Sequence, residues 1–226
     1  MSILLQPPTT EVRTTARRVP LEADEPTTLV EVYKRVARVH QKADTLNYKR
    51  DGAWHMRVYD EWQPLAAHAA VIHVNWYEAD AWCRWAGRRL PSEAEWERAA
   101  ATTPHDAHRK LRYPWGDDAP DHARANLFGV CGGTAEVAAC ATGDSAWGCR
   151  QMLGNVWEWT ADWFNPYPGF VPDPYQEYSQ PWFGNHKVLR GGCHATSAPL
   201  LRNTWRNFYT PDRRDVFAGF RTCAQD

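Results

Sequence analysis

The sequence lacks several features that would assign a function directly. No apolar run approaches the roughly 20 residues that cross a bilayer, and the opening residues 1–6 are too short for the core of a secretion signal. The net charge is −1 at pH 7, so no strong field of either sign attracts nucleic acid or an anionic membrane surface. We therefore expect a cytoplasmic protein that binds neither nucleic acid nor a membrane.

The sequence also lacks the cysteine patterns of a disulfide framework. None of its six cysteines stands in a CxxC pair, and the chain has no export features. Cys83 falls on the inner face of a predicted helix, where a thiol behaves as a small apolar group. We expect most of the thiols to be free and buried.

Tryptophan, glycine and proline are abundant instead, with 13, 14 and 16 residues. Such a composition favours a core of large rings held by irregular loops, with fewer long helices and strands than usual. The length is ample for one main domain with its own core.

Residues 1–45 differ from the remainder. Residues 9–18 are polar and basic without periodicity, which predicts a mobile tail. Residues 28–42 carry apolar side chains at helical spacing, which predicts one amphipathic helix. We therefore predict an atypical tail plus one helix in residues 1–45 and the main domain in residues 46–226.

The clearest secondary-structure patterns follow within residues 48–87. Residues 48–63 alternate well enough for a hairpin that turns at residues 49–52. Residues 71–74 predict a short strand. Asn75 can then cap a helix that ends at Gly87.

A second helix is predicted to start at Ser92, which forms a capping box with Glu95. The helix dipole favours both Glu93 and Glu95 at this N-terminus. Because this gives the two acids a structural use, we assign them no catalytic role.

Glu158 stands between two tryptophans on a predicted strand, where a buried carboxylate needs a cationic partner. Arg190 or Arg221 would serve. His105 and His108 lie in a polar loop with no helix to aim them, so we assign them no metal site. A buried, hydrogen-bonded role is expected for His194.

The last forty residues place many arginines among aromatic rings. A guanidinium in such surroundings loses water and must recover that cost from carboxylates, carbonyls or ring faces. The turn at residues 209–214 offers a phenol, a carboxylate and two guanidiniums, which favours a binding role. The Pro- and Tyr-rich loop at residues 165–183 is long enough to wall a cleft.

Five blocks carry a family resemblance. They read, in order, NWYEADAWCRWAGRRLPSEAEWERAA, YPWGD, ANL, QMLGNVWEWTADWF, and LRGG through GFRTCA. The sequence resembles the formylglycine-generating-enzyme-like (sulfatase-modifying-factor) domain family over about residues 48–226. The resemblance implies an α+β, irregular, loop-rich, C-type-lectin-like fold with short strands and two consecutive helices.

Within that family the C-terminal part resembles the C-terminal half of ergothioneine- and selenoneine-type sulfoxide synthases. The matching stretches read PYPGFVPDPYQEYSQPWFG, HKVLRGGCHAT and RNFYTPDRRDVFAGFRTCA. Those enzymes use non-haem iron and oxygen to join sulfur or selenium to the imidazole of hercynine, a trimethylated histidine. The copper-dependent formylglycine branch carries a close cysteine pair after the Gly-Gly turn, whereas residues 197–207 contain none. The alternative is a non-catalytic binding or structural module, since a fold does not fix a function.

The resemblance also implies cofactors and partners. Fe(II) is held in the synthases by histidines of a preceding DinB-like helical domain, which residues 1–45 do not match. We therefore expect a truncated or rearranged member that is inactive alone and meets its iron in a DinB-like partner. Calcium is a further cofactor of some members, and Asn126 and Asp144 stand near the matching places.

The substrates implied are small molecules: hercynine and a thiol or selenosugar. The resemblance makes Arg213 and Arg214 candidates for the carboxylate of an amino-acid-like or thiol substrate, which a bidentate guanidinium suits. We expect Asn203, Arg206 and Tyr209 to line the same wall. The full set of implied substrate-binding residues is Asn203, Arg206, Tyr209, Asp212, Arg213, Arg214, Tyr175 and Tyr178. No catalytic residue and no metal ligand is assigned.

Overall fold

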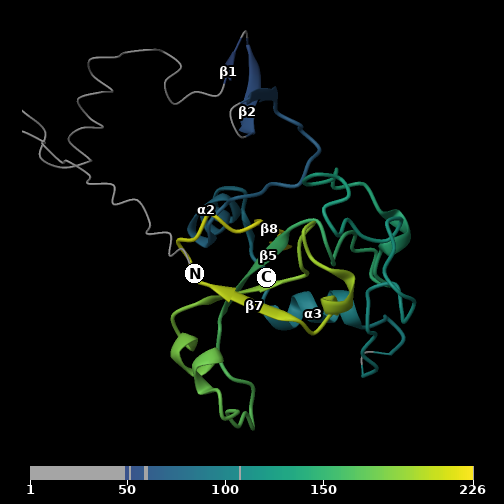
Figure 1. Ribbon diagram of the computed structural model, residues 1–226, viewed down its shortest axis with the longest axis vertical. Helices are drawn as coiled ribbons and strands as arrows, with labels where there is room; N and C mark the ends of the chain where they lie inside the picture. Colours follow the sequence, from purple (N-terminus) through teal and green to yellow (C-terminus); the bar gives the residue numbers. More distant parts are fainter. Residues whose placement is uncertain (1–48, 51, 59–60, 107, 226) are drawn as a thin grey trace, which may run out of the picture. The chain divides into compact units, whose positions relative to one another are not determined.

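The computed structural model describes residues 49–50, 52–58, 61–106 and 108–225. The chain divides into two compact units, Met1–Leu65 and Ala66–Asp226. Figure 1 shows the chain with its labelled elements. The predicted tail and helix of residues 1–45 lie outside the described residues, so they and the boundary at residue 45 stay predictions.

The described part of the first unit is a three-stranded antiparallel sheet. Its strands are β1 (Lys49–Arg50), β2 (Ala53–Val58) and β3 (Glu61–Pro64), in the order β1-β2-β3. Gly52 takes a left-handed φ of 79° at the first turn, a conformation that costs glycine little. The predicted hairpin is confirmed, with a third strand added.

The first helix of the second unit, α2 (Trp76–Trp85), begins where its sequence predicts. The Asn75 side chain accepts the Glu78 N–H at 2.9 Å, and the Glu78 carboxylate accepts the Asn75 N–H at 2.9 Å. Together these bonds satisfy two otherwise unpaired N–H groups. Gly87 follows the helix end with a left-handed φ of 65°.

The second helix, α3 (Glu93–Ala101), likewise begins at its predicted capping box. Ser92 accepts the Glu95 N–H, and Glu95 accepts the Ser92 N–H at 2.7 Å. Arg89 adds two bonds of 2.8 Å to the Glu95 carboxylate. The inward face of the helix buries Trp96 and Ala100, as its periodicity predicts.

The strand predicted for residues 71–74 is wrong, because these residues are irregular. His73 takes a left-handed φ of 61°, which breaks an extended run. The segment still lies against the sheet: the Val74 N–H donates to the Ala218 carbonyl at 3.3 Å. A Cβ added at Gly219 would lie 2.3 Å from the Val71 carbonyl oxygen, so the close approach requires glycine.

The main sheet has four strands in the order β7-β6-β5-β8. These are β7 (Arg206–Tyr209), β6 (Lys187–Arg190), β5 (Trp157–Trp163) and β8 (Ala218–Phe220). β5 and β8 are parallel, and the other two pairings are antiparallel. A separate pair joins β4 (Arg88–Arg89) to β9 (Cys223–Ala224).

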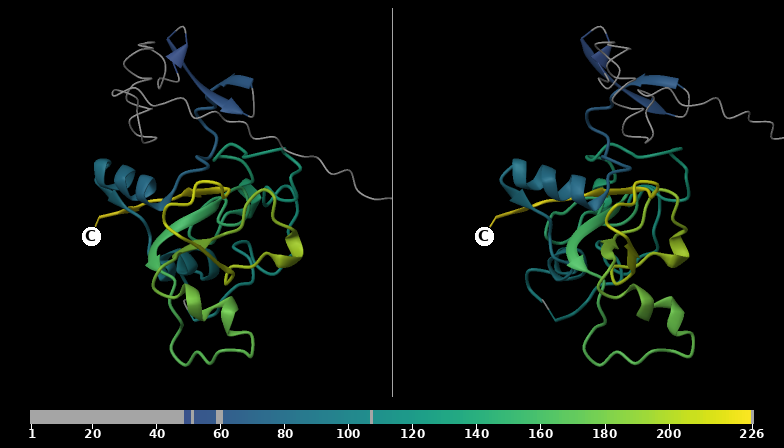
Figure 2. Two further views of the ribbon diagram at one scale, coloured as in Figure 1. Left: turned by 60° about the vertical axis from the view of Figure 1, so that its left-hand side comes forward. Right: turned by 90° about the vertical axis from the view of Figure 1, so that its left-hand side faces the viewer.

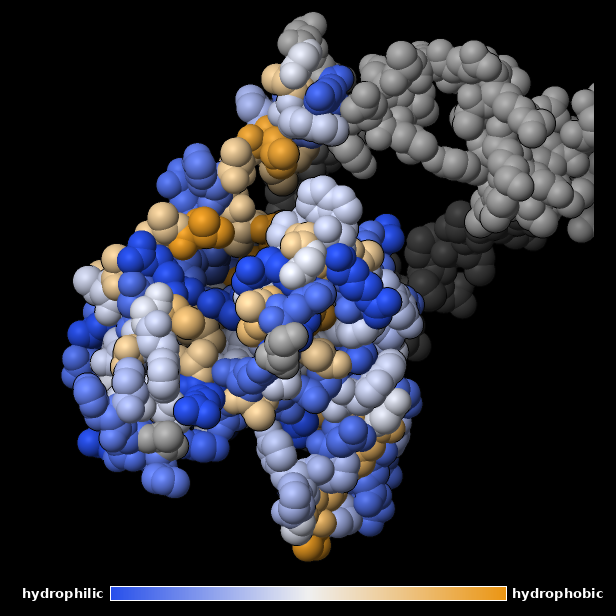
Figure 3. Space-filling view, turned by 180° about the vertical axis from the view of Figure 1, so that it is seen from behind, coloured by the Kyte–Doolittle hydropathy of each residue, from blue (hydrophilic) through white to orange (hydrophobic). Residues whose placement is uncertain are grey.

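Four single-turn 3-10 helices complete the elements of the described residues: η1 (Ala141–Gly143), η2 (Gln176–Tyr178), η3 (Gln180–Trp182) and η4 (Ala198–Leu200). η2 and η3 belong to the loop of residues 164–186, which projects from this unit as a lobe in every ribbon view (Figures 1 and 2). The space-filling view shows hydrophobic atoms at the tip of the lobe (Figure 3). Val171, which belongs to this loop, is 80% exposed.

Large rings occur in both core clusters, among a larger number of smaller apolar side chains. One cluster lies around Trp157, Trp159 and Leu189 of the main sheet and packs against α2. A second cluster joins Trp96 of α3 to Met152 and to residues of the neighbouring loops. The α+β, loop-rich fold class with two consecutive helices is thereby confirmed.

The six cysteines are free, as expected. The expectation that most are buried is wrong, because only Cys83 and Cys193 are. Of the remaining four, Cys131 is exposed, and Cys140, Cys149 and Cys223 are half-buried. No helix within the described residues is long and apolar enough to cross a membrane.

Candidate functional site

The turn at residues 210–214 directly follows β7 and is anchored to α2. The Pro211 carbonyl accepts the N–H of Trp76, the first residue of α2, at 2.9 Å. Within the turn, the Arg213 N–H donates to the Thr210 carbonyl at 3.2 Å. Tyr209 is half-buried and packs against the core cluster around Trp157. The turn is therefore held at both of its sides by regular structure.

Arg213 presents its guanidinium at the surface of this turn. The group lies 5.0 Å from the centroid of the Tyr209 ring and makes two bonds of 2.5 and 2.6 Å to the Asp215 carboxylate. The hydrogen bond from Arg213 lowers the pKa of Asp215, which keeps that carboxylate ionised. Both side chains are exposed, Arg213 by 43% and Asp215 by 66%. A ligand carboxylate could therefore take the place of Asp215.

Arg214 and His73 close the other side of the turn. The Arg214 guanidinium pairs with Glu78 of the α2 capping box at 2.8 Å, and its carbonyl oxygen lies 3.0 Å from His73 Nδ1. A carbonyl only accepts, so Nδ1 carries the proton and Nε2 of a neutral ring is left as an acceptor. No role was assigned to His73 from the sequence, although this exposed residue lies two positions before the helix cap Asn75.

Asp212 lies fully at the surface of the turn. A hydrogen bond from the Thr210 side chain lowers the pKa of the Asp212 carboxyl, and a hydrogen bond from the backbone of Asp212 lowers it further. The structure thus brings Tyr209, Asp212, Arg213 and Arg214 together.

Asn203 lies elsewhere, with only 1% of its surface exposed. Its side-chain amide donates to the Ala100 carbonyl at 3.1 Å and to the Leu111 carbonyl at 3.0 Å. These bonds join the end of α3 to the loop that follows it. The side chain therefore does not lie beside Tyr209.

Arg206 is separated from Tyr209 by the geometry of β7. Successive side chains of a strand point to opposite faces, so residues three apart cannot share one. Arg206 turns to Glu93, with bonds of 2.6 and 2.8 Å, and to the Asn165 carbonyl at 3.0 Å. The structure does not place Asn203, Arg206 and Tyr209 on one wall.

Tyr175 and Tyr178 lie on the projecting lobe, beside and within η2. They are 67% and 71% exposed, and their ring centroids are 6.4 Å apart.

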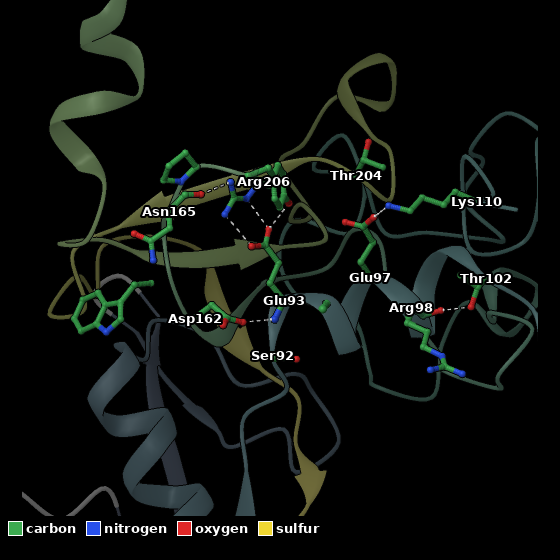
Figure 4. Close-up of a pocket in the computed structure, with 14 residues that line it drawn as sticks. Ser92, Glu93, Glu97, Arg98, Thr102, Lys110, Asp162, Asn165, Thr204 and Arg206 are labelled. Atoms are coloured by element: carbon green, nitrogen blue, oxygen red, sulfur yellow. Dashed lines mark hydrogen bonds and ion pairs between the residues drawn. The ribbon is translucent and has the colours of Figure 1, made fainter. Parts of the chain in front are cut away.

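A cleft of about 720 Å³ lies beside α3. Figure 4 shows Glu93 and Arg206 facing each other at its centre, with Glu97 and Lys110 farther along. Glu93 also accepts from Arg190 at 2.9 Å and from the Tyr167 hydroxyl at 3.1 Å. Arg190 is fully buried and bridges Glu93 to Glu97. The cleft wall is therefore a chain of alternating charges.

The sequence did not indicate the role of Glu93 in this cleft, because its position at a helix N-terminus already explained the acid. The available signal was Arg190, whose burial demanded an acid. Glu158, the acid considered for it, is bound by Arg221 instead, at 2.5 and 2.7 Å. The sequence left Arg190 and Arg221 as the two possible partners of Glu158, and in the structure the partner is Arg221.

A mononuclear iron site does not fit the described residues. No three His, Cys, Asp or Glu side chains among them lie close enough to hold a metal ion. His194 instead is buried beside the Asn155 carbonyl, with Nδ1 3.2 Å from the oxygen, as expected. Of the two calcium candidates, Asp144 accepts two hydrogen bonds of 2.8 Å from Arg150. The side-chain oxygen of Asn126 is buried and has no hydrogen-bond partner.

Comparison with known proteins assigns the family. The model of one protein family, described as the sulfatase-modifying factor enzyme 1-like domain, matches residues 22–226. The chain belongs to this family. The resemblance predicted from the five sequence blocks is confirmed.

Among relatives, the chain is 51% identical over 156 residues to the hercynine oxygenase of Mycolicibacterium thermoresistibile, a match over 67% of this chain and 35% of the relative. It is 37% identical over 170 residues to the formylglycine-generating enzyme of Streptomyces coelicolor, covering 69% of this chain and 52% of the relative. The chain thus spans about a third of the hercynine oxygenase it matches.

Among solved structures, PvdO from Pseudomonas aeruginosa superposes with a TM-score of 0.52 at 20% identity, covering 85% of this chain and 75% of that one. A likeness at this level of identity bears on the fold alone.

Proposed function

We propose that this family member is the substrate-binding module of an oxygenase that acts on hercynine and forms a carbon–sulfur or carbon–selenium bond. The supporting observation is the 51% identity to a protein named hercynine oxygenase. A second relative with that name, from Mycobacterium tuberculosis, is 48% identical over 160 residues, covering 70% of this chain and 37% of that protein. The identity to the formylglycine-generating enzyme is lower, at 37%.

The chain would bind the carboxylate of an amino-acid-like or thiol substrate at the turn that carries Arg213. A substrate carboxylate replaces Asp215 on the Arg213 guanidinium, because the two carboxylates offer the same pair of acceptor oxygens. The Arg213 guanidinium already packs over the Tyr209 ring. The Arg213 side chain therefore loses little conformational freedom when a substrate binds. Asp212 and Arg214 form the rim and would meet the polar end of the substrate.

Binding and orientation are the only steps we assign to this chain. Oxidation by iron requires a donor set that the described residues do not provide. In the proposed function those donors belong to a DinB-like partner, whose iron the bound substrate would face. The free thiols support a cytoplasmic location for the reaction.

Calorimetric titration of the full chain with cysteine and with hercynine tests the binding step. We expect saturable binding in the parent and a loss in Arg213→Ala, with Arg109→Ala as the matched control, since Arg109 is also exposed but pairs at 3.6 Å with Asp117. Oxygen consumption with Fe(II), measured with and without a DinB-like partner, tests the enzymatic step. If neither substrate binds and no oxygen is consumed with the partner, the alternative of a non-catalytic module is favoured.

A further inference from the structure

The cleft beside α3 has charged walls that are neutralised within the protein. The Glu93 carboxylate is bound by Arg190 and Arg206. Glu97 is bound by Arg190 and Lys110. These groups are mutually satisfied, so they shape the cleft without requiring a ligand.

One acid of the cleft differs from the others. Asp162 makes no ion pair within the described residues. One of its oxygens accepts the N–H of Glu93 at 2.5 Å, and no protein group donates to the other one. Figure 4 shows that Asp162 approaches the helix from the strand side, at the opposite end of the cleft from Lys110. A carboxyl oxygen at the edge of a hollow can accept from a ligand donor or face a bound cation.

Two aromatic rings share the cleft with this acid. Trp163, the neighbour of Asp162 on β5, is 43% exposed, and Tyr167 is 53% exposed. The Trp163 ring already meets the Lys187 ammonium at 4.0 Å, and the Tyr167 ring meets the Arg206 guanidinium at 4.3 Å. Both rings therefore contact cations within the protein and still present surface to the cleft.

We propose that the Asp162 end of this cleft is a binding site for a small organic cation, of the alkylammonium class. The carboxylate supplies the counter-charge, and the rings of Trp163 and Tyr167 supply the apolar faces that a methylated ammonium prefers to water. Lys187 acts on Asp162 electrostatically but makes no ion pair with it, and the Lys187 ammonium donates instead to the Ala161 carbonyl at 2.7 Å. This site is separate from the Arg213 turn and does not rest on the proposed function.

The probe for this site is tetramethylammonium chloride, added to the full chain at constant ionic strength. Binding is followed by NMR through the indole N–H signal of Trp163, which is assigned by its loss in Trp163→Phe. We expect a saturable shift of this signal with tetramethylammonium and none with sodium acetate.

Asp162→Asn is the deciding variant. Asparagine keeps an oxygen for the Glu93 N–H, so the start of α3 is preserved while the charge is removed. We expect the dissociation constant to rise about tenfold, the change that corresponds to about 1.4 kcal/mol. Asp173→Asn, which removes an exposed acid outside the cleft lining, should leave it unchanged. A shift that does not saturate, or equal affinity in Asp162→Asn and Asp173→Asn, would overturn the proposal.

Discussion

The guanidinium of Arg213 lies over the ring of Tyr209, 5.0 Å from its centroid. Tyr209 is itself fixed, because it is paired with Lys187 in the antiparallel register of β6 and β7. The ring of Tyr209 therefore fixes the position of the Arg213 guanidinium relative to the sheet. This arrangement prepares Arg213 for a planar, two-oxygen partner without burying its charge.

Replacing Arg213 with alanine should weaken substrate binding and leave the fold intact. A hydrogen bond to a charged group contributes about 1.5–3 kcal/mol, so we expect the dissociation constant for the carboxylate substrate to rise about 10- to 100-fold. The exposed pair with Asp215 contributes at most about 1 kcal/mol to stability. Calorimetry and thermal unfolding measure the two effects. Lower thermal stability with unchanged binding would assign Arg213 to the structural network instead.

His73 should affect binding through the position of the turn. His73→Ala removes the hydrogen bond to the Arg214 carbonyl, and a neutral hydrogen bond contributes about 1 kcal/mol. We expect binding at the turn to weaken severalfold. His73→Asn, which tolerates the left-handed backbone, serves as the second variant. Equal binding in the parent and in both variants would show that the turn does not need this contact.

The helices could be predicted from sequence because their signals are local. The capping boxes of Asn75 with Glu78 and of Ser92 with Glu95 each span four consecutive residues, and both helices begin there. The path of residues 71–74 could not be predicted, since it depends on the close approach of the Val71 carbonyl to Gly219. That contact joins segments far apart in the chain.

The candidate sites show the same limit. Arginines near the C-terminus could be expected to need acids, yet nothing local indicates that Arg190 pairs with Glu93 rather than Glu158. The separation of Arg206 from Tyr209 follows from strand alternation, but only once β7 is known to be a strand. The polar turn at residues 209–214 could be predicted because all of its polar groups are neighbours in sequence.

Gly219 should not tolerate a side chain. A Cβ there would lie 2.3 Å from the Val71 carbonyl oxygen, and such crowding typically costs about 1–3 kcal/mol. We expect Gly219→Ala to lower the free energy of unfolding by about that amount in urea titrations. Gly133→Ala is the control, because nothing lies within 4 Å of an added Cβ there. Equal stability of the two variants would mean that the 71–74 segment moves aside freely.

Glu95 should make stability depend on pH in the acid range. The hydrogen bonds from the Arg89 side chain and the Ser92 N–H lower the pKa of Glu95 from 4.5 to about 2. Because the folded-state pKa is lowered, the stabilisation is fully present above pH 4.5 and is lost as the pH falls towards 2. The half-exposed pair is partly screened by solvent.

Glu95→Gln tests this dependence, since glutamine can keep the capping box without the charge. Its free energy of unfolding should fall less than that of the parent between pH 4.5 and pH 2. Glu177→Gln, on the exposed lobe, provides the control. If the pH profiles of the parent and of Glu95→Gln have the same slope, the carboxylate is not the titrating group.

Arg190 should be the most costly arginine to remove. It is fully buried and binds Glu93, Glu97 and the Asn203 carbonyl at 2.6 to 2.9 Å. Arg190→Met keeps much of the volume but leaves buried acceptors without their donor, which typically costs about 3–5 kcal/mol. Arg206 and Lys110 still bind the two carboxylates, so we expect the lower end of that range, measured by urea unfolding. Arg84→Met, whose side chain is 76% exposed in its pair with Asp80, should change stability by less than about 0.5 kcal/mol. Comparable losses in the two variants would show that the cleft wall is not held by its buried charge network.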